Sequence, residues 1–143
     1  MNKFVFIIPL VLAVFVLAGC GGKPAVRGKV QFADGAPLKH GTVLFESGNS
    51  SARGQIAEDG SYALESTGTK DGVKPGDYRV SILGAVESYE VDSSVKEGSS
   101  SGKSIVYKNL IDPKFQSAAT SGLTCKVAGN TTYDISVTSP STP

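Results

Sequence analysis

The side chains able to carry out nucleophilic or metal chemistry are few in this chain. His40 is the only histidine, and Cys20 and Cys125 are the only cysteines. A zinc site needs three or four His, Cys or carboxylate ligands, and a Ser-His-Asp triad would have to run through His40. His40 lies in residues 37–41, a segment typical of an exposed turn. We therefore expect no histidine-based metal site, no catalytic triad and no cofactor.

The carboxylates offer a second kind of chemistry, because a pair can act as acid and base and a cluster can hold calcium. Glu58 and Asp59 are adjacent, however, and neighbouring residues of a strand point to opposite faces. Asp34, Asp59 and Asp71 each precede a glycine, and turn formation already explains that pairing. A calcium site or a catalytic pair, with Asp77 as a further member, is a lesser alternative to a structural role.

Cys20 stands apart because of the residues before it. Lys3 gives a positive start, residues 4–17 form an apolar run, and the small residues Ala18 and Gly19 stand directly before the cysteine. This arrangement resembles the lipobox of bacterial lipoproteins, in which the cysteine thiol is diacylated and the residues before it are removed. The resemblance implies a signal peptide over residues 1–19 and a lipid on Cys20.

Membrane residence follows from that resemblance, because two acyl chains hold a protein stably where one holds it marginally. Plain secretion and an uncleaved anchor are the alternatives, but the apolar run is several residues short of the about 20 that a spanning helix needs. Residues 20–25 would form the lipidated tether. Gly21 replaces the aspartate that would suggest inner-membrane retention, which favours the outer membrane. We expect an extracytoplasmic, lipid-anchored protein.

The charge balance of the mature chain excludes one class of partner. Cleavage after residue 19 leaves 143 − 19 = 124 residues and removes one lysine, so 13 basic and 13 acidic residues remain. A net charge near zero, without a basic run, gives no electrostatic attraction to nucleic acid. The length suits one domain with a packed core.

Apolar and polar residues alternate along most of the mature chain, which predicts strands with one buried and one exposed face. The alternating segments are 26–32, 43–45, 62–64, 78–82, 123–127 and 133–137. We expect an all-β fold with one domain over residues 26–138, a β-sandwich of about seven or eight strands. A closed barrel is the lesser alternative. Cys125 shares strand parity with Leu123 and Val127, so we expect it in the core.

Residues 86–104 interrupt this alternation, because they are rich in Ser, Gly, Glu and Lys. The composition predicts a long, flexible loop, and residues 139–143 predict a disordered tail. Tyr89 lies in this loop and Tyr107 just after it. These two tyrosines are the candidate residues for a small surface that binds a glycan or a partner protein.

Three blocks of the chain resemble a known family. They are G-x-V-x-F-x-D-G-x-P-L over residues 28–38, D-G-S-Y over 59–62 and P-G-x-Y-x-V over 75–80. Together they resemble the carboxypeptidase regulatory-like domain, a transthyretin-like or prealbumin-type β-sandwich. Residues 107–124 look like the small exported lipoproteins of planctomycete-type bacteria. The resemblance implies an accessory module without catalytic residues, in which Tyr62 and Tyr78 point into the sandwich.

These observations favour a lipid-anchored cell-envelope protein that is not an enzyme. Its β-sandwich would have a structural or protein-interaction role, with the membrane and an envelope protein or glycan as partners. The alternative is a ligand-binding lipoprotein that captures glycan or peptide at the loop end of the sandwich. A hydrolase with a carboxylate site is a third hypothesis.

Overall fold

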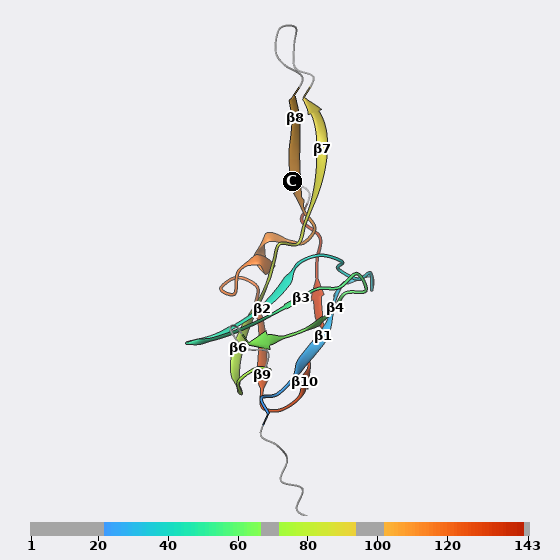
Figure 1. The fold of residues 1–143 in the computed structure, drawn as a ribbon. Coiled ribbons are helices and arrows are strands. Elements are labelled where there is room, and N and C mark those ends of the chain that lie inside the picture. Colours follow the sequence, from blue (N-terminus) through green and yellow to red (C-terminus); the bar gives the residue numbers. More distant parts are fainter. Residues whose placement is uncertain (1–21, 67–71, 94–101, 142–143) are drawn as a thin grey trace, which may run out of the picture.

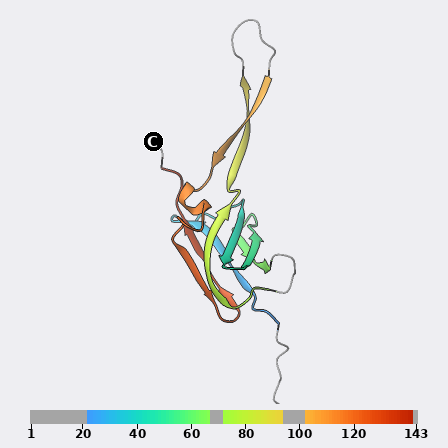
Figure 2. The same ribbon diagram turned by 90° about the vertical axis from the view of Figure 1, so that its left-hand side faces the viewer.

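The computed structural model describes residues 22–66, 72–93 and 102–141, and these form an almost entirely β-structure (Figure 1). Two sheets form a sandwich, and a two-stranded ribbon projects from one end (Figures 1 and 2). The prediction of an all-β sandwich is confirmed. The described residues form eleven strands rather than seven or eight, because several strands are pieces of two or three residues. The predicted signal peptide and Cys20 lie outside the described residues.

The first sheet is built around β1 (Val26–Phe32). This strand pairs antiparallel with β4 (Ser61–Ala63), and parallel with β10 (Thr131–Thr132) and β11 (Ile135–Val137). The second sheet has the order β5-β3-β2-β6-β9. Its strands are β5 (Glu65–Ser66), β3 (Ser50–Gln55), β2 (Thr42–Ser47), β6 (Gly76–Leu83) and β9 (Leu123–Val127).

The core lies between the two sheets and follows the predicted alternation. In β6, Tyr78, Val80 and Ile82 are buried, whereas Asp77 and Arg79 are exposed. Ser81 departs from the pattern, because it is buried on the outer face of this strand. Burial of each large apolar side chain contributes about 1.5–3 kcal/mol, so this alternation drives the sheets together. The largest fully buried side chains are Phe45, Leu38, Ile82, Ile111, Ile135, Val26, Val30, Val43, Val73, Val80, Val127 and Val137.

The edge of β1 along β10 and β11 is interrupted at Tyr133 and Asp134. There Asp134 Oδ1 accepts the Lys29 N–H at 2.9 Å, where a regular ladder would use a backbone carbonyl. The carbonyl of Tyr133 accepts the Tyr62 hydroxyl at 2.6 Å instead. A Cβ at Gly28 would lie 1.9 Å from that carbonyl oxygen, so only glycine fits this close approach. The last strand therefore begins at residue 135, two residues later than predicted.

The pairs Asp34-Gly35 and Asp59-Gly60 form turns, as the sequence predicts. Gly60 has φ +81°, in the left-handed region that favours glycine. Beside it, Asp59 Oδ1 accepts the backbone N–H of Ser61 at 2.9 Å and the Ser61 hydroxyl at 2.6 Å. These bonds hold the turn that leads into β4, so this carboxylate has a structural role.

The prediction of a flexible loop over residues 86–104 is wrong for the part that the structure describes. Residues 86–93 form β7 (Val86–Ser93), and β8 (Gly102–Asn109) pairs with it over eight residue pairs. Residues 94–101 lie outside the described ranges. The composition was misleading because a ribbon with no sheet packed against it does not need one apolar and one polar face. We call residues 86–93 and 102–109 the arm.

The segments before the first strand and after the last strand differ in their contacts with the sandwich. The Pro24 carbonyl accepts the Val73 N–H at 2.8 Å, and the Ala25 N–H donates to Asn130 Oδ1 at 2.9 Å. These two bonds tie Pro24 and Ala25 to the sandwich, although residues 22–25 have no regular secondary structure and the first strand begins at Val26, as predicted. Residues 139–141 have no regular secondary structure, and residues 142–143 lie outside the described part of the chain.

Candidate functional site

The arm carries four of the five exposed large apolar side chains of the described residues, and the fifth is Leu83 at the end of β6. Tyr107 is 69%, Ile105 59%, Tyr89 49% and Val91 40% exposed. The arm projects from the end of the sandwich opposite residues 22–25 (Figures 1 and 2). Exposed apolar residues gathered on one element indicate an interaction site more often than residues scattered singly.

Tyr89 and Tyr107, the predicted binding residues, both lie on the arm but on opposite faces. Tyr89 pairs with Val106, whereas Tyr107 pairs with Ser88. Directly paired residues share a face, and successive residues alternate between faces. One face therefore carries Tyr89, Val91 and Val106, and the other carries Ile105 and Tyr107. The expectation that the two tyrosines form one small surface is wrong.

The charges of the arm are separated by strand. Glu87, Glu90 and Asp92 lie on β7, and Lys103 and Lys108 lie on β8. Lys103 Nζ lies 3.1 Å from Glu90 Oε2 in an exposed ion pair, which contributes at most about 1 kcal/mol. β7 is thus an acidic edge, and β8 is a basic one.

Two short connections, each with one fully buried residue, join the arm to the sandwich. Only Gly84 and Ala85 separate β6 from β7, and Ala85 is fully buried. The Leu110 N–H donates to the Ala85 carbonyl at 2.9 Å, and Ile111 is fully buried just after β8. The base of the arm is therefore fixed to the core while its side chains face solvent.

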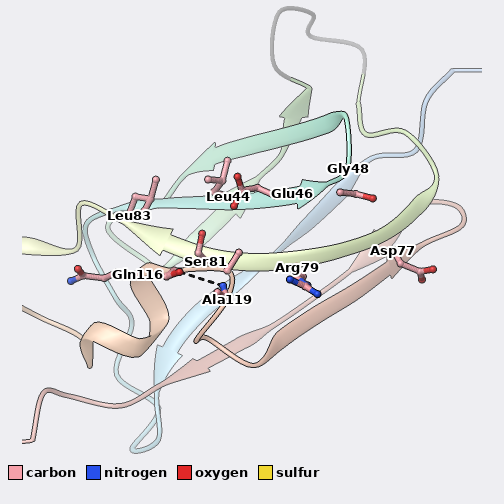
Figure 3. A pocket seen from close by; sticks show the side chains of 12 residues that line it. Leu44, Glu46, Gly48, Asp77, Arg79, Ser81, Leu83, Gln116 and Ala119 are labelled. Atoms are coloured by element: carbon pink, nitrogen blue, oxygen red, sulfur yellow. Dashed lines mark hydrogen bonds between the residues drawn. The ribbon is translucent and has the colours of Figure 1, made fainter.

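A shallow groove of about 690 Å³ lies on the outer face of β2 and β6. Glu46, Arg79 and Asp77 line the strand side, and the segment after the 3₁₀ helix η1 (Pro113–Gln116) forms the opposite wall (Figure 3). Ser117 Oγ accepts the Ala119 N–H at 3.3 Å and shapes that wall. Glu46 is the direct cross-strand partner of Arg79 in the β2–β6 ladder. The groove thus offers both charge signs to a ligand.

The histidine and carboxylates that the sequence offers for chemistry either stabilise turns or do not come together in one site. His40 is exposed in the turn before β2, and Glu58 is exposed beside the Asp59 turn. Hydrogen bonds from Ser61 lower the pKa of Asp59 below its ordinary value. Asp71 lies outside the described residues. Within the described ranges, no group of three or more His, Cys, Asp and Glu side chains could hold a metal ion.

Residues 98–102 read Gly-Ser-Ser-Ser-Gly, which matches the Gly-x-Ser-x-Gly spacing of a nucleophile elbow. That motif needs a strand before the serine and a helix after it. Here the next described element is the strand β8, which begins at Gly102. The structural context of a nucleophile elbow is therefore missing, and the stretch matches a Ser/Gly-rich linker composition.

The buried tyrosines and the cysteine belong to the core, as predicted. Tyr62 and Tyr78 are buried, and the Tyr78 hydroxyl donates to the Lys74 carbonyl at 2.8 Å. Cys125 is a buried free thiol opposite Tyr78 in the β6–β9 ladder. Burial raises the pKa of the Cys125 thiol, which disfavours the reactive thiolate.

Comparison with protein-family models, with curated proteins and with solved structures returned no match. The described residues contain no helix that is long and apolar enough to span a membrane. Sequence reasoning missed the strand character of the arm and the groove. The arm gave no clear signal in the sequence, because its exposed apolar residues lie on both faces of the ribbon.

Proposed function

We propose that this chain is a lipid-anchored protein of the bacterial cell envelope, without enzymatic activity, that makes protein contacts through its arm. The observation that carries the proposal is the exposure of Tyr89, Val91, Ile105 and Tyr107 on a ribbon that stands clear of the sandwich. Tyrosine is among the residue types enriched in protein interfaces, because it adds contact area and a hydrogen-bonding group.

The proposed anchor rests on the residues that precede and include Cys20. It is supported by the position of residues 22–25, which leave the sandwich at the end away from the arm (Figure 1). A lipid on Cys20 would therefore hold the sandwich near the membrane and direct the arm away from it. The proposed membrane is the outer one.

We keep the carboxypeptidase regulatory-like domain as the proposed family. The turn at Asp59, the buried Tyr62 and the buried Tyr78 support it, because the matching motif positions have structural roles. An accessory module of this kind agrees with a contact function better than with catalysis.

The anchor is tested by feeding producing cells an alkyne fatty acid and detecting label on the protein. We expect label on the natural chain and none on Cys20→Ser. Label that persists on Cys20→Ser would contradict the anchor.

The contact function is tested by placing a photo-crosslinking amino acid at Tyr107 in living cells, with the same substitution at the exposed Glu58 as control. We expect a discrete crosslinked product from position 107 that position 58 does not give. Identical patterns from both positions would exclude a contact at this part of the arm.

A second candidate function is the capture of a peptide or glycan, and the groove favours a ligand that carries both charges. Arg79 could bind a carboxylate while Glu46 or Asp77 binds an ammonium group. Calorimetric titration with short zwitterionic peptides tests it, with Arg79→Ala expected to abolish the heat. Heat that Arg79→Ala leaves unchanged would exclude this site.

A further inference from the structure

The outer edge of β7 is an unpaired strand edge with an unusual charge. Among the described residues β7 pairs only with β8, so its other edge has no neighbouring strand. In an antiparallel ribbon alternate residues direct their N–H and C=O groups to each side, so this edge presents free backbone groups. Proteins often protect such edges with lysine, whereas β7 has Glu87, Glu90 and Asp92 and no lysine.

Two of these three carboxylates have no ion-pair partner in the described part of the chain. Glu90 pairs with Lys103, but Glu87 and Asp92 form no ion pair there. Both side chains are exposed. An incoming basic strand would therefore meet two carboxylates that form no ion pair among the described residues, one near each end of β7.

The pairing of β7 with β8 indicates which side chains suit a strand that lies beside β7. On the inner edge, Lys108 lies opposite Glu87, Val106 opposite Tyr89, and Lys103 opposite Asp92. Side chains of a strand stand above and below the sheet, so a strand on the outer edge would meet the same residues. Basic residues at both ends and β-branched or aromatic residues between them would suit that edge as well.

We infer that the outer edge of β7 accepts an extended, basic segment of another protein as an added strand. The inference rests on the proposed contact function and deepens it by naming the partner chemistry. Backbone hydrogen bonds to β7 would supply affinity, and the two free carboxylates would select a segment with lysine or arginine near each end. Apolar side chains of that segment would cover Tyr89 and Val91 on one face.

The probe is a labelled peptide with the sequence of residues 102–109, titrated into the full-length chain in detergent while fluorescence anisotropy is recorded. The double variant Glu87→Lys and Asp92→Lys reverses both free charges, and Glu58→Lys is the control on the sandwich. We expect binding to weaken about tenfold or more in the double variant, because two attractions become repulsions, and to stay unchanged in Glu58→Lys.

A second peptide with reversed charges tests whether the two carboxylates select the partner. When glutamate replaces both lysines of the peptide, it should bind the double variant and not the natural chain. A scrambled peptide of the same composition separates strand pairing from simple charge attraction. Bound peptide should also slow amide hydrogen exchange in residues 86–93 and leave β3 unchanged. Circular dichroism establishes that each variant is folded.

Equal binding of the scrambled peptide, or no difference between the variants, would overturn the inference. A dimer of the chain itself that the double variant dissolves would also overturn it, because the added strand would then come from a second copy. If no peptide binds while crosslinking at Tyr107 persists, the strand-addition model fails and the proposed contact function remains.

Discussion

Phe45 in the sandwich and Tyr107 in the arm are both aromatic residues in antiparallel strands, yet one is fully buried and the other is 69% exposed. Phe45 lies between the sheets, with its ring centre 5.9 Å from those of Tyr78 and Tyr133. Tyr107 lies on a ribbon that has no second layer on either face among the described residues. Buried aromatic residues such as Phe45 stabilise the fold, whereas exposed ones such as Tyr107 are available to a partner.

A two-stranded ribbon is marginally stable by itself in water. The arm therefore depends on the sandwich, which holds its base through Ala85 and Ile111. The sandwich does not depend on the arm in return, because no described arm residue belongs to the core cluster. Substitutions in the sandwich should therefore change the free energy of unfolding, whereas substitutions in the arm should change binding to a partner.

The largest effect is expected for Phe45→Ala. Removing a fully buried phenyl ring leaves a cavity, so the free energy of unfolding should fall by about 4 kcal/mol. Denaturant unfolding followed by circular dichroism measures it, with Ile105→Ala in the arm as the matched control. Similar losses in both variants would contradict the division between core and arm.

A smaller loss is expected for Gly28→Ala. The new Cβ would lie 1.9 Å from the Tyr133 carbonyl oxygen, so the edge between β1 and residue 133 must shift, at about 2–3 kcal/mol. The same unfolding measurement checks this, and Gly22→Ala is the control because a Cβ at that position would have no atom within 4 Å. A neutral Gly28→Ala would mean that the Tyr62–Tyr133 hydrogen bond is not maintained.

The double variant Ile105→Ser and Tyr107→Ser should change stability by less than about 0.5 kcal/mol, because both side chains are already exposed. It should nevertheless reduce crosslinking from a photo-reactive residue placed at Ser88, which shares their face of the arm. Undiminished crosslinking would show that the partner uses the other face, where Tyr89 lies.

The smallest expected effect is on stability at low pH. Hydrogen bonds from Ser61 hold the pKa of Asp59 below the ordinary value of 3.8. A pKa lowered by folding adds stability above the unfolded value that is lost as the pH falls through the folded value. Asp59→Asn should therefore flatten the decrease in unfolding temperature between about pH 5 and pH 2. A curve identical to that of the natural chain would show that this turn does not contribute.

The all-β sandwich could be predicted because its signals are local. In β6, Tyr78, Val80 and Ile82 alternate with polar residues, and the period of two alone predicts a half-buried strand. Asp59 and Gly60 form a turn because of their own backbone preferences. The burial of Cys125 followed from the same parity.

The arm and the functional positions could not be predicted in this way. Serines, glycines and charges in residues 86–104 hid two strands, because a ribbon exposed on both faces has no parity to preserve. The separation of Tyr89 from Tyr107 depends on which residues pair across the ribbon. Register of this kind joins distant residues and leaves no local pattern.

By itself, the sequence determined which residues avoid water and where the chain turns, since alternation and Asp-Gly pairs act over a few neighbouring residues. Only the tertiary structure decided that the Tyr133 carbonyl meets Gly28 and Tyr62, and that three carboxylates gather on one free strand edge. The physical reason is that hydrogen-bonding partners and exposed edges are set by how strands pair, and pairing brings together residues that are far apart along the chain.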